Sequence, residues 1–212
     1  NGRSRGLGDV YKRQDISTDS LGSDNLEDLI SHSKKVVDAT KDIALAYKPN
    51  FAFFEKWGSK GFEWLEEMMG YIGDGPITIA DAKRGDIGNT AKQYAASIFG
   101  HFDFDSVTLS PYMGEDSIMP FLNNEEKGVF ILCRTSNPSA KTFQSLNFHN
   151  EAKLYEQVAK WADSLNVNDN VGLVVGATAP EELIKVRRLA PTLPILTPGT
   201  VSYTHLTLPT MS

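Results

Sequence analysis

Apolar and polar residues alternate along the chain between two patterns, one typical of amphipathic helices and one typical of buried strands. Helical spacing predicts helices over 26–37, 61–69, 91–99, 154–161 and 180–189, with a short helical connection around Phe121 and Leu122. Short, nearly continuous apolar runs predict strands over 43–48, 77–80, 106–112, 128–136, 171–178 and 194–199. Either Ser23 or Asp24 can cap the first helix. The sequence therefore predicts about six alternations of strand and helix.

Strands separated by segments of helical length predict a parallel sheet, because a parallel connection must cross back over the sheet. Both a doubly wound α/β sheet and a (β/α)8 TIM barrel meet this requirement. The barrel is favoured, because no glycine-rich phosphate-binding motif opens a helix. The candidate polar residues instead follow the carboxyl ends of strands, which converge on one mouth in a barrel. These residues are Lys48, Asp81, Lys83, Ser136 and Pro198.

Composition narrows the class of protein. A length of 212 residues with 41% hydrophobic residues suits one packed domain, and no apolar run is long enough to span a bilayer. The net charge of -6 gives no general electrostatic reason to bind nucleic acid. The single cysteine, Cys133, excludes an internal disulfide and lies in an apolar run, so we expect it in the core. We expect a soluble, cytoplasmic protein that binds neither nucleic acid nor membranes.

The two ends of the chain differ in pattern from the rest. Residues 1–14 show no apolar period, and residues 201–212 begin abruptly after a Pro-Gly pair. Both ends resemble translated sequencing-adaptor read-through, so we interpret them as non-native tails on a barrel fragment formed by residues 15–200. The alternative is that they are genuine, irregular termini.

The most informative stretch is 80–90, where a strand, a turn and a helix follow one another. Side chains two apart in a strand project to the same face, so Asp81 and Lys83 should lie side by side. Asp86 falls in the turn or at the helix amino terminus, where a carboxylate is favoured. A surface ion pair with a helix cap is the plainer interpretation. Lys48, at the end of an earlier strand, either is buried beside a carboxylate or extends its ammonium to solvent.

The stretch 80–90, A-D-A-K-R-G-D-I-G-N-T, resembles the active-site signature of the orotidine 5′-monophosphate decarboxylase family. The similarity is to the bacterial branch, whose central motif is D-A-K-R-G-D-I-G. Further segments that resemble this branch occur in the right order at 46–50, 110–116, 135–138 and 175–178. The resemblance extends over about 15–199, although the short D-x-K-x-x-D is shared with sugar-phosphate decarboxylases of the same superfamily.

The resemblance implies that the chain comes from an enzyme that decarboxylates orotidine 5′-monophosphate to UMP and CO2 in pyrimidine biosynthesis. It implies a homodimer without a metal or organic cofactor, in which Lys83 donates the proton and Asp86 and Thr90 reach the partner's site. The implied catalytic residues are Lys48, Asp81, Lys83 and Asp86. The implied substrate-binding residues are Ile87, Thr90, Ser136 and Pro198.

The family pattern also includes segments that this sequence does not match. A strand before Asp15 and a strand after Gly199, with an arginine that grips the 5′-phosphate, are both expected in the family. We therefore expect an incomplete barrel without the first and eighth strands, and an inactive chain. Two alternatives remain open: a sugar-phosphate decarboxylase or aldolase that needs Mg²⁺, and a non-catalytic phosphate-ligand or interaction module.

Overall fold

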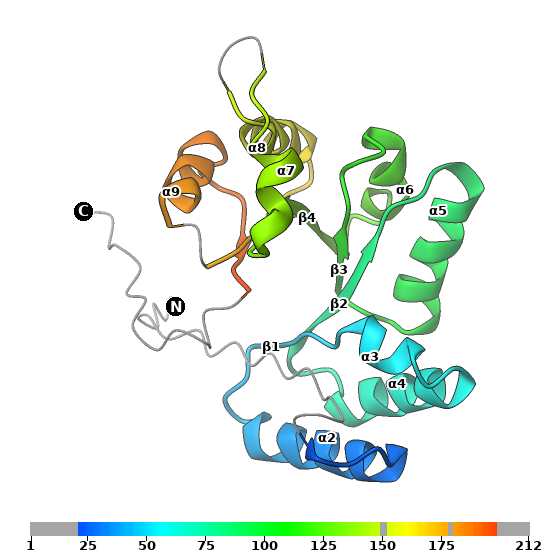
Figure 1. Cartoon of the computed structure of the whole chain (residues 1–212). Coiled ribbons are helices and arrows are strands. Elements are labelled where there is room, and N and C mark those ends of the chain that lie inside the picture. Colours follow the sequence, from blue (N-terminus) through cyan, green and yellow to red (C-terminus); the bar gives the residue numbers. More distant parts are fainter. Residues whose placement is uncertain (1–20, 149–151, 178–179, 199–212) are drawn as a thin grey trace, which may run out of the picture.

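In the computed structural model, residues 21–148, 152–177 and 180–198 are described, so both predicted tails lie outside the described residues. Six strands form one sheet in the order β1-β2-β3-β4-β5-β6. Every neighbouring pair is parallel. The sheet curls, and the helices lie around its outer side (Figure 1). Because strand order follows chain order, the fold is part of a (β/α)8 barrel and the doubly wound alternative is excluded.

All six predicted strands are present, with shifted ends. β2 extends as far as Arg84, inside the stretch 80–90, whereas the other five strands are shorter than predicted. The strands are β1 (Ala46–Tyr47), β2 (Ile77–Arg84), β3 (Ser106–Leu109), β4 (Gly128–Arg134), β5 (Val171–Val175) and β6 (Ile195–Leu196). Each of β1 and β6 has one edge that pairs with no other strand in the described part of the chain.

The predicted helices are also present, including the short connection around Phe121 and Leu122, and the structure adds further short helices between them. The long helices are α2 (Leu26–Thr40), α4 (Ser59–Ile72), α5 (Gly88–Ala95), α8 (Leu154–Leu165) and α9 (Pro180–Leu189). The short helices are α3 (Phe51–Glu55), α6 (Met119–Leu122) and α7 (Lys141–Gln144). A π-helical turn, η1 (Ala96–His101), extends α5, and the 3-10 turns η2 (Glu115–Ser117) and η3 (Pro138–Ala140) precede α6 and α7. No helix in the described ranges is long and apolar enough to cross a membrane.

The cap predicted for the first helix was wrong by one or two residues. Asn25, not Ser23 or Asp24, is the N-cap of α2, and its Oδ1 accepts a hydrogen bond of 2.9 Å from the Glu27 N–H. The Ser23 hydroxyl instead donates to Asp28 at 2.6 Å. All three residue types cap helices well, so the pattern could not decide which of them begins the helix.

The sheet has an apolar layer on each face. The larger layer fills the space between strands and helices and includes Ala80, Leu109, Ile131 and Leu173. A smaller cluster of Ile79, Val174 and Leu196 lies on the opposite, inner face. Because side chains of a strand alternate between faces, Ile79 and Ala80 face opposite layers. Parallel strands buried on both faces explain the nearly continuous apolar runs of the sequence.

Candidate active site

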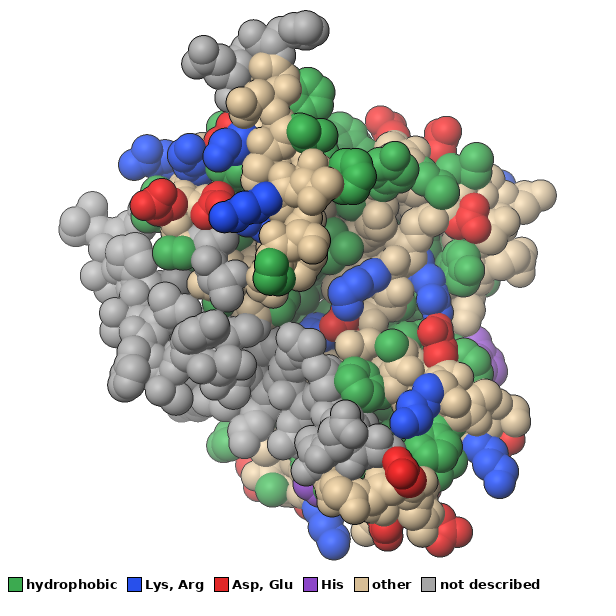
Figure 2. Space-filling view, viewed as in Figure 1, with side chains coloured by type: hydrophobic (Ala, Val, Ile, Leu, Met, Phe, Trp, Pro, Cys, Tyr) green, Lys and Arg blue, Asp and Glu red, His purple; other side chains and the backbone are tan. Residues whose placement is uncertain are grey.

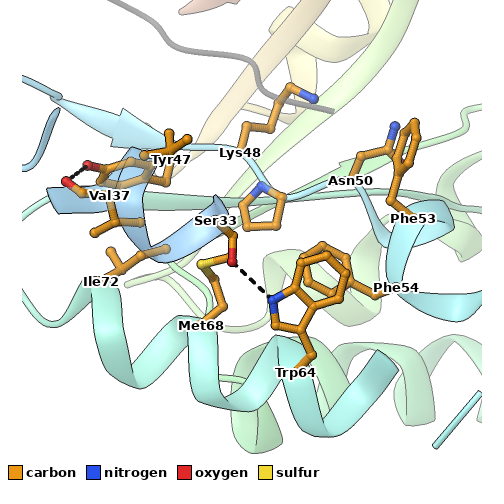
Figure 3. Close-up of a pocket in the computed structure, with 12 residues that line it drawn as sticks. Ser33, Val37, Tyr47, Lys48, Asn50, Phe53, Phe54, Trp64, Met68 and Ile72 are labelled. Atoms are coloured by element: carbon orange, nitrogen blue, oxygen red, sulfur yellow. Dashed lines mark hydrogen bonds between the residues drawn. The ribbon is translucent and has the colours of Figure 1, made fainter. Parts of the chain in front are cut away.

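Lys48 follows β1 and points away from the helices. Tyr47, one residue earlier, points toward α2, where its hydroxyl donates to the Val37 carbonyl at 3.3 Å (Figure 3). On the same side of β1, Trp64 of α4 donates to the Ser33 hydroxyl of α2 at 3.2 Å. The Lys48 side chain is 1% exposed. The prediction of a buried lysine paired with a carboxylate is therefore confirmed, and an ammonium extended to solvent is excluded.

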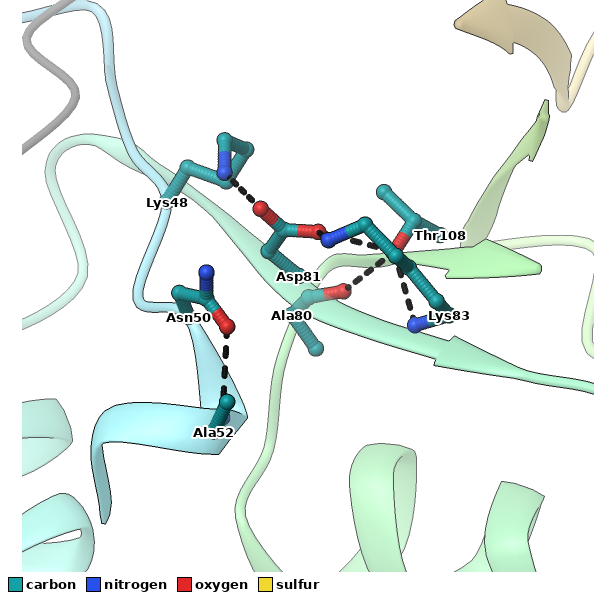
Figure 4. Close-up of polar contacts among 7 residues, drawn as sticks. All are labelled: Lys48, Asn50, Ala52, Ala80, Asp81, Lys83 and Thr108. Carbon is teal, nitrogen blue, oxygen red and sulfur yellow. Dashed lines mark hydrogen bonds and ion pairs between the residues drawn. The ribbon is translucent and has the colours of Figure 1, made fainter. Parts of the chain in front are cut away.

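The Asp81 carboxylate on β2 joins two lysines. One oxygen, Oδ2, pairs with Lys48 Nζ, and the other, Oδ1, lies 2.5 Å from Lys83 Nζ (Figure 4). The Asp81 side chain is 7% exposed, whereas that of Lys83 is 50% exposed. Blue and red side chains meet near the middle of the face shown in Figure 2, over β2. Asp81 and Lys48 thus form a buried pair, whereas half of the Lys83 side chain is exposed to solvent.

The pKa of Asp81 is held below its usual value by the two lysines. Burial by itself would raise this pKa, but the charge of Lys48 and the hydrogen bonds from Lys48 and Lys83 outweigh it. The carboxylate is therefore ionised at neutral pH.

The backbone at Lys83 is not a regular strand. Its φ is +47°, in the left-handed region, and the register with β3 shifts between Ala80 and Arg84. The expected contact between Asp81 and Lys83 is confirmed, although the backbone at Lys83 departs from regular strand geometry. The Lys83 N–H donates to Thr108 Oγ1 at 3.0 Å, and this hydroxyl lies 3.3 Å from Asp81 Oδ1. Strained backbone of this kind is a feature of functional sites.

Asp86, Ile87 and Thr90 lie apart from this cluster. Asp86 is in the turn between β2 and α5, where its Oδ1 accepts from the Ile87 N–H at 2.8 Å. Ile87 is 52% exposed and Thr90 is exposed on the first turn of α5. Within the described residues, Asp86 forms no ion pair with Lys83. Asp86 itself is half-buried, so the structure of one chain brings three of the four predicted charged residues together and leaves Asp86 apart.

Ser136 and Pro198 follow the carboxyl ends of two other strands. Ser136 is exposed in the turn after β4, and Pro198 follows β6. The Pro198 carbonyl accepts from the Ala177 N–H at 3.0 Å, which ties the chain after β6 to the end of β5. Since the strands are parallel, these two residues lie at the same edge of the sheet as Lys48 and Asp81. This agrees with the predicted common mouth.

Three residues near the cluster were missed by the sequence prediction. Thr108 is a buried polar residue within an apolar strand, which was the available signal. Asn50 caps α3 and forms a parallel bridge with Asp81, and its amide nitrogen points away from α3 (Figure 4). Arg84 pairs with Glu55 at 2.5 Å, and no period or spacing in the sequence joins those two positions.

Cys133 is not placed to act as a nucleophile. Cys133 is buried, donates to the Tyr155 carbonyl at 3.2 Å, and burial raises its pKa to about 12, which confirms the core prediction. Among the described residues, no group of three or more His, Cys, Asp or Glu side chains lies close enough to hold a metal ion.

Comparison with known proteins connects this geometry to a family. Residues 20–202 match the model of the orotidine 5′-phosphate decarboxylase / HUMPS family. A protein of Halorubrum lacusprofundi named orotidine 5′-phosphate decarboxylase is 51% identical over 168 residues, which cover 79% of this chain and 59% of the relative. One of the same name from Dehalococcoides mccartyi is 47% identical over 173 residues, covering 80% of this chain and 64% of the relative. The chain thus spans less than two thirds of the length of these curated relatives.

Solved structures give the same result. The structure of Leishmania donovani OMP decarboxylase superimposes with a TM-score of 0.80 and 45% identity, over 84% of this chain and 71% of the other. A structure titled as a putative orotidine-monophosphate-decarboxylase from Toxoplasma gondii superimposes with a TM-score of 0.83 and 38% identity, over 87% of this chain and 72% of the other. Since the family model covers most of the chain and the likeness extends to the fold, the chain belongs to the orotidine 5′-phosphate decarboxylase / HUMPS family.

Proposed function

We propose that the complete gene product containing this chain decarboxylates orotidine 5′-monophosphate to UMP and CO2. The observation that carries the proposal is the Lys48–Asp81–Lys83 cluster at the carboxyl end of β2, in a chain of this family. Relatives that share 47% to 51% identity with the chain bear the name of this activity.

The chemistry requires positive charge and a proton at one point. When the bond from C6 of the pyrimidine to the carboxylate breaks, its electron pair stays on C6 and CO2 leaves. The ring offers no adjacent group that can accept this charge, so preorganised cations must stabilise it. Lys83 suits this role, because its half-exposed ammonium is held by a buried, ionised carboxylate. The same ammonium then gives its proton to C6 and recovers one from solvent.

The other residues have supporting roles in this proposal. Lys48 keeps Asp81 ionised and in place, and it contacts the ribose. Ser136 contacts the pyrimidine, while Ile87 and Pro198 pack near the base. Their placement at the strand ends or just after β2 supports these roles. Because Lys83 supplies both charge and proton, the proposed mechanism uses no metal or organic cofactor. We place the reaction in the cytoplasm, in keeping with the one free cysteine.

The test is an assay of the complete gene product with orotidine 5′-monophosphate, followed by loss of substrate and formation of UMP. We expect turnover that is unchanged by excess EDTA. Turnover of a sugar phosphate that EDTA abolishes would support the metal-dependent decarboxylase or aldolase instead. Binding of the nucleotide without turnover would support a non-catalytic module.

We further propose a homodimer in which Asp86 and Thr90 serve the partner's site. Thr90 is exposed, and Asp86, half-buried in the turn before α5, forms no ion pair with Lys83 among the described residues, which supports this arrangement. The inactive variants Asp86→Ala and Lys83→Ala, mixed and allowed to exchange subunits, should regain activity. In a mixed dimer, one of the two sites has both residues intact, so up to about half of the wild-type activity per mixed dimer is expected by symmetry.

One variant carries a tag, so that size-exclusion chromatography can measure the fraction of mixed dimers. The recovered activity is then compared with this fraction. Each variant alone is the control. If mixed dimers form and no activity returns, Asp86 does not act across the interface.

A further inference from the structure

The turn that carries Ser136 is held by a side chain from another element. Gln144, at the end of α7, makes two hydrogen bonds to Thr135. Its Oε1 accepts from the Thr135 N–H at 2.9 Å, and its Nε2 donates to Thr135 Oγ1 at 2.8 Å. The Thr135 hydroxyl in turn donates to Asn137 Oδ1 at 2.6 Å. The residues on both sides of Ser136 are therefore fixed by one continuous chain of hydrogen bonds.

The chain of hydrogen bonds has a defined direction. The Thr135 hydroxyl has one proton, which it gives to Asn137, so its remaining bond must come from a donor. An amide side chain supplies a donor for this hydroxyl and an acceptor for the Thr135 N–H at once. A carboxylate at position 144 could accept hydrogen bonds from both the Thr135 N–H and the Thr135 hydroxyl, but the hydroxyl could then no longer donate to Asn137. Glutamine is thus matched to the turn in chemistry as well as in length.

Other contacts bring the same turn close to β5. Arg134 Nη1 donates to the Thr135 carbonyl at 2.5 Å, and the Gly176 N–H donates to the Arg134 carbonyl at 2.7 Å. A Cβ on Gly176 would lie 2.7 Å from Ser136 Cβ and 2.8 Å from its backbone nitrogen. The turn packs so closely on the end of β5 that a small displacement of Thr135 must move Ser136 as well.

We propose that Gln144 is a positioning residue for base recognition, because it fixes the turn from which Ser136 reaches the pyrimidine. This inference rests on the proposed function, in which the ligand is a pyrimidine nucleotide. Gln144 acts through Thr135 and does not touch the reacting atoms. Its loss should therefore weaken nucleotide binding and leave the proton transfer by Lys83, on a different strand, nearly unchanged.

The test compares Gln144→Met with the wild-type complete gene product. Methionine fills a similar volume without either hydrogen bond. We expect the dissociation constant for UMP, measured by calorimetry, and KM for orotidine 5′-monophosphate to rise about tenfold or more, since small misplacements of binding groups have effects of this order. The value of kcat should change less than about threefold. Gln157→Met on α8, a half-buried glutamine outside the site, is the matched control and should behave as wild type.

Two further variants make the test independent of the folding of Gln144→Met. Gln144→Glu keeps the shape and should weaken UMP binding in the same way. Thr135→Val removes the hydroxyl, and its effect should not add to that of Gln144→Glu, because both break the same chain of hydrogen bonds.

The outcomes separate this inference from the proposed function. Unchanged UMP affinity in both Gln144 variants, or a fall in kcat with KM unchanged, overturns the positioning role. If the wild type binds UMP without turnover, the decarboxylase proposal fails while the UMP affinities still test Gln144. If the wild type neither binds UMP nor turns over the substrate, both the decarboxylase proposal and the positioning role of Gln144 are overturned.

Discussion

We expect that replacing Lys83 by alanine in the complete gene product lowers kcat for decarboxylation at least about a hundredfold, the lower range for loss of a positioned general acid. The reason is that, in the proposed mechanism, the Lys83 ammonium provides both the charge opposite C6 and the proton. Asp81 remains buried beside Lys48 in this variant, so the fold should survive. The measurement is a single-turnover assay, which follows the chemical step directly.

The matched control is Lys60→Ala, which removes an exposed lysine on α4 and should leave the rate constant unchanged. Binding of UMP to Lys83→Ala shows whether the site is still formed. A rate constant near that of the wild type, with the substitution verified, removes Lys83 from the mechanism.

We expect that replacing Lys48 by methionine lowers the free energy of unfolding by about 3 kcal/mol, the cost of removing one member of a buried ion pair. The Asp81 carboxylate stays buried, with Lys83 and Thr108 as its remaining partners. Burial then opposes ionisation with less compensation, so the pKa of Asp81 should rise. Urea unfolding at pH 7 measures the change in the free energy of unfolding, with Lys60→Met as the control.

The dependence on pH follows from the direction of this pKa. In the wild type the folded pKa of Asp81 is depressed, so its contribution to stability is present above the unfolded pKa and is lost as the pH falls through the folded value. In Lys48→Met the folded pKa is higher, so this loss should begin at a higher pH. Unfolding curves of the two proteins between neutral and acid pH give the comparison. Parallel curves would show that Lys48 does not set the ionisation of Asp81.

The sequence was sufficient to predict the architecture, because buried parallel strands appear in it as short, nearly continuous apolar runs. The run 171–175 is apolar throughout and is buried on both faces. Element ends were harder to predict, since β1 was expected over 43–48 and pairs only at Ala46–Tyr47. Ile43 and Leu45 are each 60% exposed, so an apolar residue is not always a buried one.

The site was predictable where local spacing decides the geometry, and less so where distant elements meet. Asp81 and Lys83 are two residues apart, so their contact could be inferred. The turn at Thr135 could be predicted from its hydroxyl and amide residues, but its link to Gln144 depends on how α7 folds back. The left-handed φ at Lys83 carried no local signal, because a lysine rarely adopts it.

The order of the strands also bears on how the site is assembled during synthesis. The charged cluster draws only on residues between Lys48 and Thr108, all on the first three strands or at their ends. Two positions proposed to contact the base come later, with Ser136 after β4 and Pro198 after β6, whereas the third, Ile87, lies between Lys48 and Thr108. Because a chain leaves the ribosome amino terminus first, the residues of the charged cluster are synthesised before Ser136 and Pro198. Under the proposed function, a nascent chain therefore contains its charged cluster before it contains two of the side chains proposed to hold the base.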